Sequence, residues 1–224
     1  MIKKLVSLVC CLLPMGAGAV VVSPESGQQS VSTADAAWQS AVSAGNSITI
    51  NTGNGIVATG RGASGDADYV AGGFSVANNM YVGVASDQGS IAGDLYILNS
   101  ASNPFTIIST GDVSIGSILQ VLGGKTLALQ SNNTGTNFNL TIGSNQVNEG
   151  IEVGDATQSA KLTLNNIDAL TVNGSVITYG DMSVDANTIK MGQVNANDGD
   201  FTVVANTVEM AGLVSNTADG ATVT

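Results

Sequence analysis

Residues 181–194 read DMSVDANTIKMGQV, and residues 200–213 read DFTVVANTVEMAGL. The second stretch begins nineteen residues after the first, and Asp, Val, Ala, Asn, Thr and Met recur at matching positions. Where the two differ, apolar character is often kept, as Met182 matches Phe201 and Ile189 matches Val208. A fixed internal period of this length is the signature of a repeat protein.

The nineteen-residue step extends backwards from these two copies. Four apolar-polar-apolar triplets fall in register: Ile151-Glu152-Val153, Leu170-Thr171-Val172, Ile189-Lys190-Met191 and Val208-Glu209-Met210. Two positions before the triplets stand the polar residues Glu149, Asp168, Asn187 and Asn206. A second series keeps nearly the same step with one slip: Leu162-Thr163-Leu164, Met182-Ser183-Val184 and Phe201-Thr202-Val203. The register predicts that equivalent triplets stack as neighbouring parallel strands, one turn of chain per repeat.

Strand alternation then assigns each triplet residue to a side. The predicted inward stack is Ile151, Leu170, Ile189 and Val208, and the predicted outward row is Glu152, Thr171, Lys190 and Glu209. Lys190 should lie beside Glu209 as a weak surface pair. The polar residues that precede the triplets should also stack and share side-chain hydrogen bonds along the axis.

These patterns predict an all-β right-handed parallel β-helix of about nineteen residues per coil. The eighteen-residue step of left-handed hexapeptide helices is missing, and right-handed crossovers are the usual ones. A β-sandwich is the alternative. Short alternating segments from Ser47 onward support the strand assignment, and residues 53–75 and 86–94 are predicted to be loops.

Three regions follow from this interpretation: a signal peptide at 1–19, an N-terminal segment at 20–46, and the β-helix at 47–224, which is predicted to continue beyond the given chain. Lys3 and Lys4, the apolar run of residues 5–13 and the Ala-Gly-Ala at 17–19 are typical of a secretory signal. Within 20–46, Thr33 or Asp35 is expected to cap a short helix that contains Trp38.

The net charge limits the kinds of partner that the chain can bind, and the cysteine content limits its disulfide bonds. The whole chain has a net charge of −11, and loss of Lys3 and Lys4 with the signal leaves −13. Such a surface repels nucleic acid, so no nucleic-acid partner is expected. Both cysteines, Cys10 and Cys11, lie in the signal, so the exported chain has no disulfide to stabilise it.

The sequence provides little for catalysis. There is no His, and only Arg61, Lys125, Lys161 and Lys190 remain as basic residues after processing, widely spaced in sequence. We therefore expect no enzyme activity, no catalytic residues, no cofactor and no metal. The Gly60–Gly65 stretch matches G-x-G-x-x-G, but no helix pattern follows it, so a turn is predicted. Residues 195–200, NANDGD, are rich in oxygen ligands, which leaves a Ca²⁺ site as an alternative to a plain turn.

An exported, acidic chain rich in Gly, Asn, Thr and Val with such repeats resembles the passenger region of bacterial autotransporter and filamentous-haemagglutinin-type adhesins, over residues 47–224. Residues 51–56, NTGNGI, are a loose echo of an export motif in that group. The resemblance implies an extracellular or outer-membrane-associated surface protein that binds a host or cell-surface protein or glycan. It also implies outer-membrane secretion machinery if the chain is part of a longer one.

The second hypothesis is a carbohydrate-binding or carbohydrate-cleaving β-helix. An exposed row of aromatic residues along one face would favour it. The four tyrosines, Tyr69, Tyr81, Tyr96 and Tyr179, do not share the nineteen-residue step, which weighs against such a row.

Overall fold

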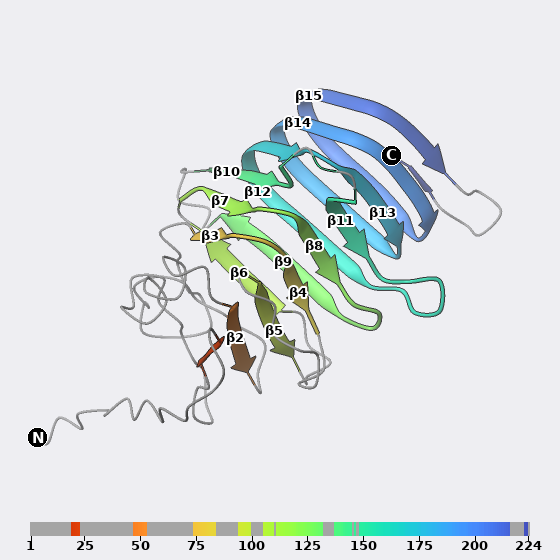
Figure 1. The fold of residues 1–224 in the computed structure, drawn as a ribbon. Helices are drawn as coiled ribbons and strands as arrows, with labels where there is room; N and C mark the ends of the chain where they lie inside the picture. Colours follow the sequence, from red (N-terminus) through yellow and green to blue (C-terminus); the bar gives the residue numbers. More distant parts are fainter. Residues whose placement is uncertain are drawn as a thin grey trace, which may run out of the picture.

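The computed structural model describes residues 19–22, 47–52, 74–83, 94–99, 105–109, 111–131, 137–144, 146, 148–215 and 222–223. These residues form strands and turns and contain no helix, and nine of the parallel strands curve 289° round an axis to an almost closed structure. In Figure 1 the strands stack as successive rungs, with β2 and β5 near one end and β14 and β15 at the other. The predicted helix around Trp38 and the Gly60–Gly65 stretch lie outside the described residues.

Strand pairing arranges the rungs into three faces, defined here by their register. The first face holds β6 (Phe105–Ser109), β9 (Thr126–Ser131) and the opening residues of β12 (Lys161–Val172), β14 (Asp181–Asp198) and β15 (Asp200–Ser215). The second face holds β3 (Phe74–Val76), β7 (Val113–Ile115), β10 (Phe138–Ile142) and the following parts of β12, β14 and β15.

The third face starts with β1 (Ala19–Val22), β2 (Ser47–Thr52), β5 (Leu95–Asn99) and β4 (Met80–Val82). It goes on through β8 (Ile118–Val121), β11 (Gly150–Val153), β13 (Ser175–Tyr179) and the last parts of β14 and β15. The short β16 (Thr222–Val223) pairs with the start of β15. Every pairing between these strands is parallel, which does not fit the antiparallel sheets of the alternative β-sandwich.

Alternating side chains explain why these segments fold as strands around one core. Along β9 the side chains alternate between half-buried and buried, and Leu127 and Leu129 are fully buried. Their register partners on the next rung, Leu162 and Leu164, are fully buried as well. Stacking of equivalent apolar residues thus removes a continuous column of surface from water, which is the main stabilising term in a chain with few aromatic residues.

The nineteen-residue register is confirmed on the last rungs. Met182 pairs with Phe201 on the first face, and Leu170, Ile189 and Val208 pair in succession on the second. The slip predicted between the two series is a bulge between Leu164 and Ile167. Asn166, with a φ of 55°, takes the left-handed conformation that an Asn accommodates there.

The prediction for Ile151, the first residue of the predicted inward stack, is wrong. Ile151 pairs with Leu119 and Val176 on the third face, and Leu140 takes the place beside Leu170. The sequence step fails there because coil length is not constant. Register neighbours are 39 residues apart at Ser75–Ser114, 32 at Gln120–Glu152 and 19 at Asp168–Asn187.

Val208 also departs from its prediction. It occupies an inward register position, beside the fully buried Ile189, yet 45% of it is exposed. The reason is its place on β15, the last full rung that the structure describes, where no further rung covers it.

The first rungs do not follow chain order. On the third face β5 pairs with both β2 and β4, although β4 precedes it in sequence. The buried carboxylate of Asp94 accepts hydrogen bonds from the backbone N–H and the side-chain amide of Asn79, at 3.0 and 3.1 Å. Asn79 in turn accepts one from the N–H of Ile118, at 3.2 Å. This chain of bonds ties together the starts of β5, β4 and β8. The sequence pattern did not predict β1, and β3 begins at Phe74, within the segment 53–75 that was predicted to be a loop.

Candidate functional site

One continuous row of side chains runs along the outside of the third face. Register pairing joins Tyr81 to Gln120, Gln120 to Glu152, Glu152 to Ile177, and Ile177 to Asn195. All five side chains are half-buried. Each sits between inward residues of its strand, as Tyr81 does between the fully buried Met80 and Val82. Because side chains alternate between the two sides of a strand, these five side chains point away from the core.

The polar part of this row is Tyr81, Gln120 and Glu152, called here the tyrosine row. The side-chain amide of Gln120 donates a hydrogen bond of 2.7 Å to a carboxylate oxygen of Glu152. Partial burial raises the pKa of the Tyr81 phenol, and the nearby carboxylates of Asp94 and Glu152 raise it further. The ring therefore stays neutral and protonated at neutral pH, beside two acids.

The strand next to Tyr81 carries a second tyrosine, for which the structure describes the backbone. The backbone of Tyr96 on β5 pairs directly with that of Tyr81 on β4. That the tyrosines form no exposed row stays a prediction, and the nineteen-residue step does not show this backbone pairing. The reason is that the early coils are much longer than nineteen residues and that β5 lies out of chain order, so no constant period could reveal the pair.

Lys125 reaches the end of the same row. Gly83 follows β4 with a φ of +91°, and a Cβ built there would lie 2.3 Å from Cγ of Lys125. The aliphatic part of Lys125 therefore packs over the glycine, two residues beyond Tyr81, and any larger residue at 83 would displace it. The lysine stem thus lies beside the strand that carries Tyr81, the first residue of the row.

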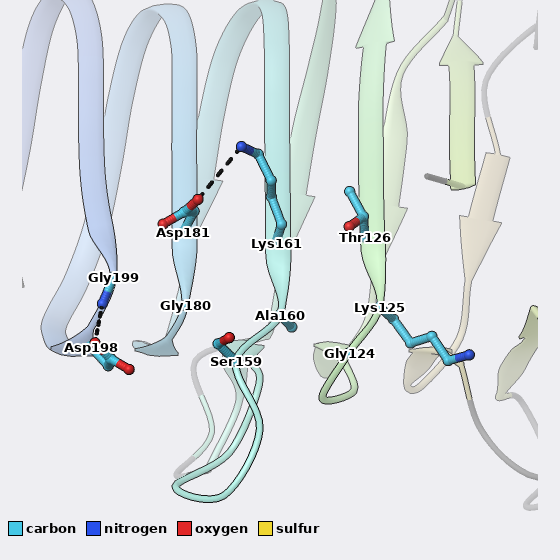
Figure 2. Close-up of a pocket in the computed structure, with 10 residues that line it drawn as sticks. All are labelled: Gly124, Lys125, Thr126, Ser159, Ala160, Lys161, Gly180, Asp181, Asp198 and Gly199. Atoms are coloured by element: carbon cyan, nitrogen blue, oxygen red, sulfur yellow. Dashed lines mark hydrogen bonds and ion pairs between the residues drawn. The ribbon is translucent and has the colours of Figure 1, made fainter. Parts of the chain in front are cut away.

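A second polar feature is an open hollow of about 410 Å³ at the turns that join the third face to the first. Figure 2 shows its lining, which comes from four successive rungs: Gly124, Lys125, Thr126, Ser159, Ala160, Lys161, Gly180, Asp181, Asp198 and Gly199. The Nζ of Lys161 lies 3.5 Å from a carboxylate oxygen of Asp181 on the neighbouring strand. Lys125 extends away from this pair (Figure 2).

Basic and acidic residues that are far apart in the sequence line the same hollow. Lys161 pairs in register with Thr126 and Asp181, and its backbone N–H donates to the carbonyl of Lys125 at 2.9 Å. The side chains of Lys161 and Asp181 are 52% and 49% exposed, so water screens their attraction. This ion pair is therefore a weak surface contact within the hollow.

Two backbone N–H groups of the turn at 195–200 donate to carboxylates, one within the turn and one on the rung before it. Asp198 accepts from the N–H of Gly199 at 2.8 Å, and Asp181 accepts from the N–H of Asp200 at 3.2 Å. Within the described ranges, no group of three or more acidic, His or Cys side chains is placed to hold a metal ion.

Glu149 has a structural role different from the predicted one. It does not stack with Asp168 but accepts hydrogen bonds from the N–H of Gln146 and from the N–H and hydroxyl of Ser144. The bond from Gln146, together with those from Ser144, outweighs partial burial and lowers the pKa of Glu149. The carboxylate thereby closes the loop between β10 and β11.

The other polar stack is as predicted. Asn187 donates to Asp168 at 2.8 Å, and Asn206 donates to Asn187 at 3.4 Å. Lys190 and Glu209 form the expected surface pair, with 3.6 Å between Nζ and the carboxylate oxygen. Both features follow the direction in which the rungs stack.

Comparison with protein families, with characterised proteins and with solved structures finds no match for the chain. The described part of the chain contains no apolar helix of membrane-spanning length. The strand arrangement defines the class of the protein as a parallel β-structure of solenoid type.

Proposed function

We propose that this protein is an exported structural or adhesive shaft, similar to the β-helical passenger of a bacterial surface adhesin. The observation that carries the proposal is the division of the rungs before β15 into a buried apolar stack and an outward row that meets water. Ile189 and Leu170 are buried in the core, whereas Lys190 and Glu209 are largely exposed beside them. Such a rung presents long, regular surfaces to a partner.

The finer fold that we propose is a right-handed parallel β-helix. Three faces per coil and parallel pairing support a helical path, and right-handed crossovers are the common ones between parallel strands. The localisation belongs to the same proposal. The segment at 1–19 directs export, and the mature chain acts at the cell surface or outside the cell, through outer-membrane machinery if it is part of a longer protein.

Export and adhesion can be tested separately. The full chain is expressed in a Gram-negative host beside a variant that lacks residues 2–19. The proposal predicts that the intact chain leaves the cytoplasm with its N-terminus at Val20, whereas the variant stays inside. Beads coated with the exported protein should then adhere to host-cell monolayers more than albumin-coated beads. Cytoplasmic, unprocessed protein contradicts the export proposal, and equal adhesion contradicts the adhesive one.

A second candidate function, carbohydrate binding, is favoured by the tyrosine row. Tyrosine offers an apolar ring with a polar tip, and Gln120 and Glu152 offer a donor and acceptors held in fixed geometry by their mutual bond. The backbone of Tyr96, on the neighbouring strand β5, pairs with that of Tyr81. Because the row and the whole chain are acidic, a neutral oligosaccharide fits better than a sulfated or sialylated one.

The carbohydrate candidate predicts binding of neutral oligosaccharides on a glycan array, without turnover. Tyr81→Ala should abolish it, and Gln120→Ala should weaken it about tenfold, because each removes one contact class. Tyr179→Ala is the matched control, since Tyr179 is a half-buried tyrosine on the same face but outside the row. Equal loss in the control, or binding of acidic glycans only, would count against this site.

A further inference from the structure

Asn173 and Gly174 turn the chain from the end of β12 into the start of β13, and hydrogen bonds to the rung before them hold this corner. The side-chain amide of Asn173 donates to the carbonyl of Gly143 at 2.9 Å. On the other side of the corner, the N–H of Ser175 donates to the carbonyl of Glu149 at 3.0 Å. The Asn173–Gly174 peptide bond is therefore fixed from both ends.

Position 174 has no room for a side chain. A Cβ built on Gly174 would lie 2.0 Å from the backbone oxygen of Glu149. One rung further on, a Cβ built on Gly192 would lie 2.2 Å from the backbone oxygen of Gly174 itself. Close stacking of the rungs therefore requires a glycine after Asn173, and this requirement creates an Asn-Gly sequence in the middle of the core.

An Asn-Gly pair can lose ammonia without an enzyme. The backbone nitrogen of the glycine attacks Cγ of the asparagine, and a five-membered imide forms as the bond from Cγ to Nδ2 breaks. Ammonia leaves with the proton of the glycine N–H. Water then opens the imide at either carbonyl, returns a proton to the nitrogen, and leaves aspartate or isoaspartate. Glycine permits the attack because it has no Cβ to obstruct it, and asparagine is one of the thermally labile residues.

We propose that Asn173 is a deamidation site that the folded corner protects and that reacts when the corner opens. In the fold the amide nitrogen that has to leave is bonded to Gly143, and the backbone on either side is fixed, so Cγ is held away from the nitrogen of Gly174. Local opening of the rung releases both constraints, and segments of a native protein open with free energies of their own. Reaction at Asn173 therefore records how often this corner has opened.

Deamidation then hinders the corner from closing again. An aspartate at position 173 cannot donate to the carbonyl of Gly143, and it carries a new negative charge. A Cβ built on Gly143 would lie 3.3 Å from Oε2 of Glu149 and 3.6 Å from Cβ of Asn173, so the two carboxylates would face the same glycine and repel each other. Isoaspartate also lengthens the backbone by one carbon atom at a corner that has no spare room. This inference is independent of any adhesive or sugar-binding role.

Peptide mapping of the full chain by mass spectrometry measures the reaction during incubation at mildly alkaline pH, in buffer and in concentrated urea. We expect deamidation of Asn173 to be at least about tenfold slower in buffer than in urea, because the folded corner has to open first. Glu149→Gln weakens the adjacent loop, so it should raise the rate in buffer and leave the rate in urea unchanged. Asn54-Gly55 is the same dipeptide elsewhere in the chain and serves as the internal reference in urea.

The consequence for the fold has a test of its own. Asn173→Asp should lower the melting temperature, whereas Asn195→Asp should change it little. Asn195 is the matched control, because its substitution adds the same charge and keeps the oxygen that accepts from Gln193 at 3.1 Å. Equal rates at Asn173 in buffer and in urea overturn the proposal, as does an Asn173 that stays intact in urea while Asn54 reacts. An Asn173→Asp variant as stable as the parent overturns the proposed effect on the corner.

Discussion

Single glycines mark where rungs approach too closely for a side chain. Gly150 has a φ of +127°, and a Cβ built there would lie 1.9 Å from the backbone oxygen of Ser175. We expect Gly150→Ala to lower the free energy of unfolding by about 2–4 kcal/mol, because both the clash and the positive φ are penalised. Gly212→Ala, where a Cβ would meet nothing within 4 Å, should change it by less than about 0.5 kcal/mol. Urea denaturation measures both, and equal effects would contradict the close packing at β11.

Glu149 gives the fold a dependence on pH. Its folded-state pKa is lowered, mainly by the backbone hydrogen bond from Gln146. The ionised carboxylate therefore stabilises the fold above its unfolded-state pKa, and this contribution is lost as pH falls through the lower, folded-state value. Glu149→Gln should lower the melting temperature at pH 7, and the difference from the parent should shrink in acid, between pH ~5 and ~2.

Glu209→Gln is the control for that measurement. Its side chain is 71% exposed, so its ion pair with Lys190 contributes only a few tenths of a kcal/mol. A difference for Glu149→Gln that stays constant from pH 7 into acid would show that the carboxylate charge does not matter to the loop.

At the scale of an element, stacking between rungs predicts very different costs for two equivalent residues. Ile189 is fully buried, and its register partner Val208 is 45% exposed. Ile189→Ala should lower the free energy of unfolding by about 2–5 kcal/mol, from lost burial and the cavity left behind. Val208→Ala should cost less than about 1 kcal/mol. Denaturant titration of both variants checks this, and similar losses would mean that β15 is covered under the conditions used.

The sequence predicted the elements best where each rung has nearly constant length. The stack from Leu170 to Val208, the row from Asp168 to Asn206 and the Lys190–Glu209 pair all follow from a nineteen-residue step. The sequence could not predict the partners of Ile151, because loops of different lengths interrupt the earlier coils. A register set by long-range pairing has no local signal in such a region.

At the scale of the whole molecule, the sequence could not predict the candidate site, for the same reason. Tyr81 and Tyr96 come from strands that lie out of chain order, and Gln120 and Glu152 are 32 residues apart. No sequence period connects these four residues. The sequence shows only the alternation within each strand. That alternation agrees with the burial of Met80 and Val82 and with the outward position of Tyr81 between them. The general class of fold was therefore predictable, and the position of its polar surface was not.

The central claim is that successive rungs pair in parallel with a nineteen-residue step. The most direct test is disulfide formation between Asn187→Cys and Asn206→Cys in a chain with Cys10→Ser and Cys11→Ser. These side chains already meet at 3.4 Å on adjacent parallel strands. An antiparallel hairpin with Gly199 and Asp200 as its two turn residues would instead bring residue 187 next to residue 212. We predict rapid cross-linking of the 187/206 pair and none of Asn187→Cys with Gly212→Cys. The reverse result would contradict the account.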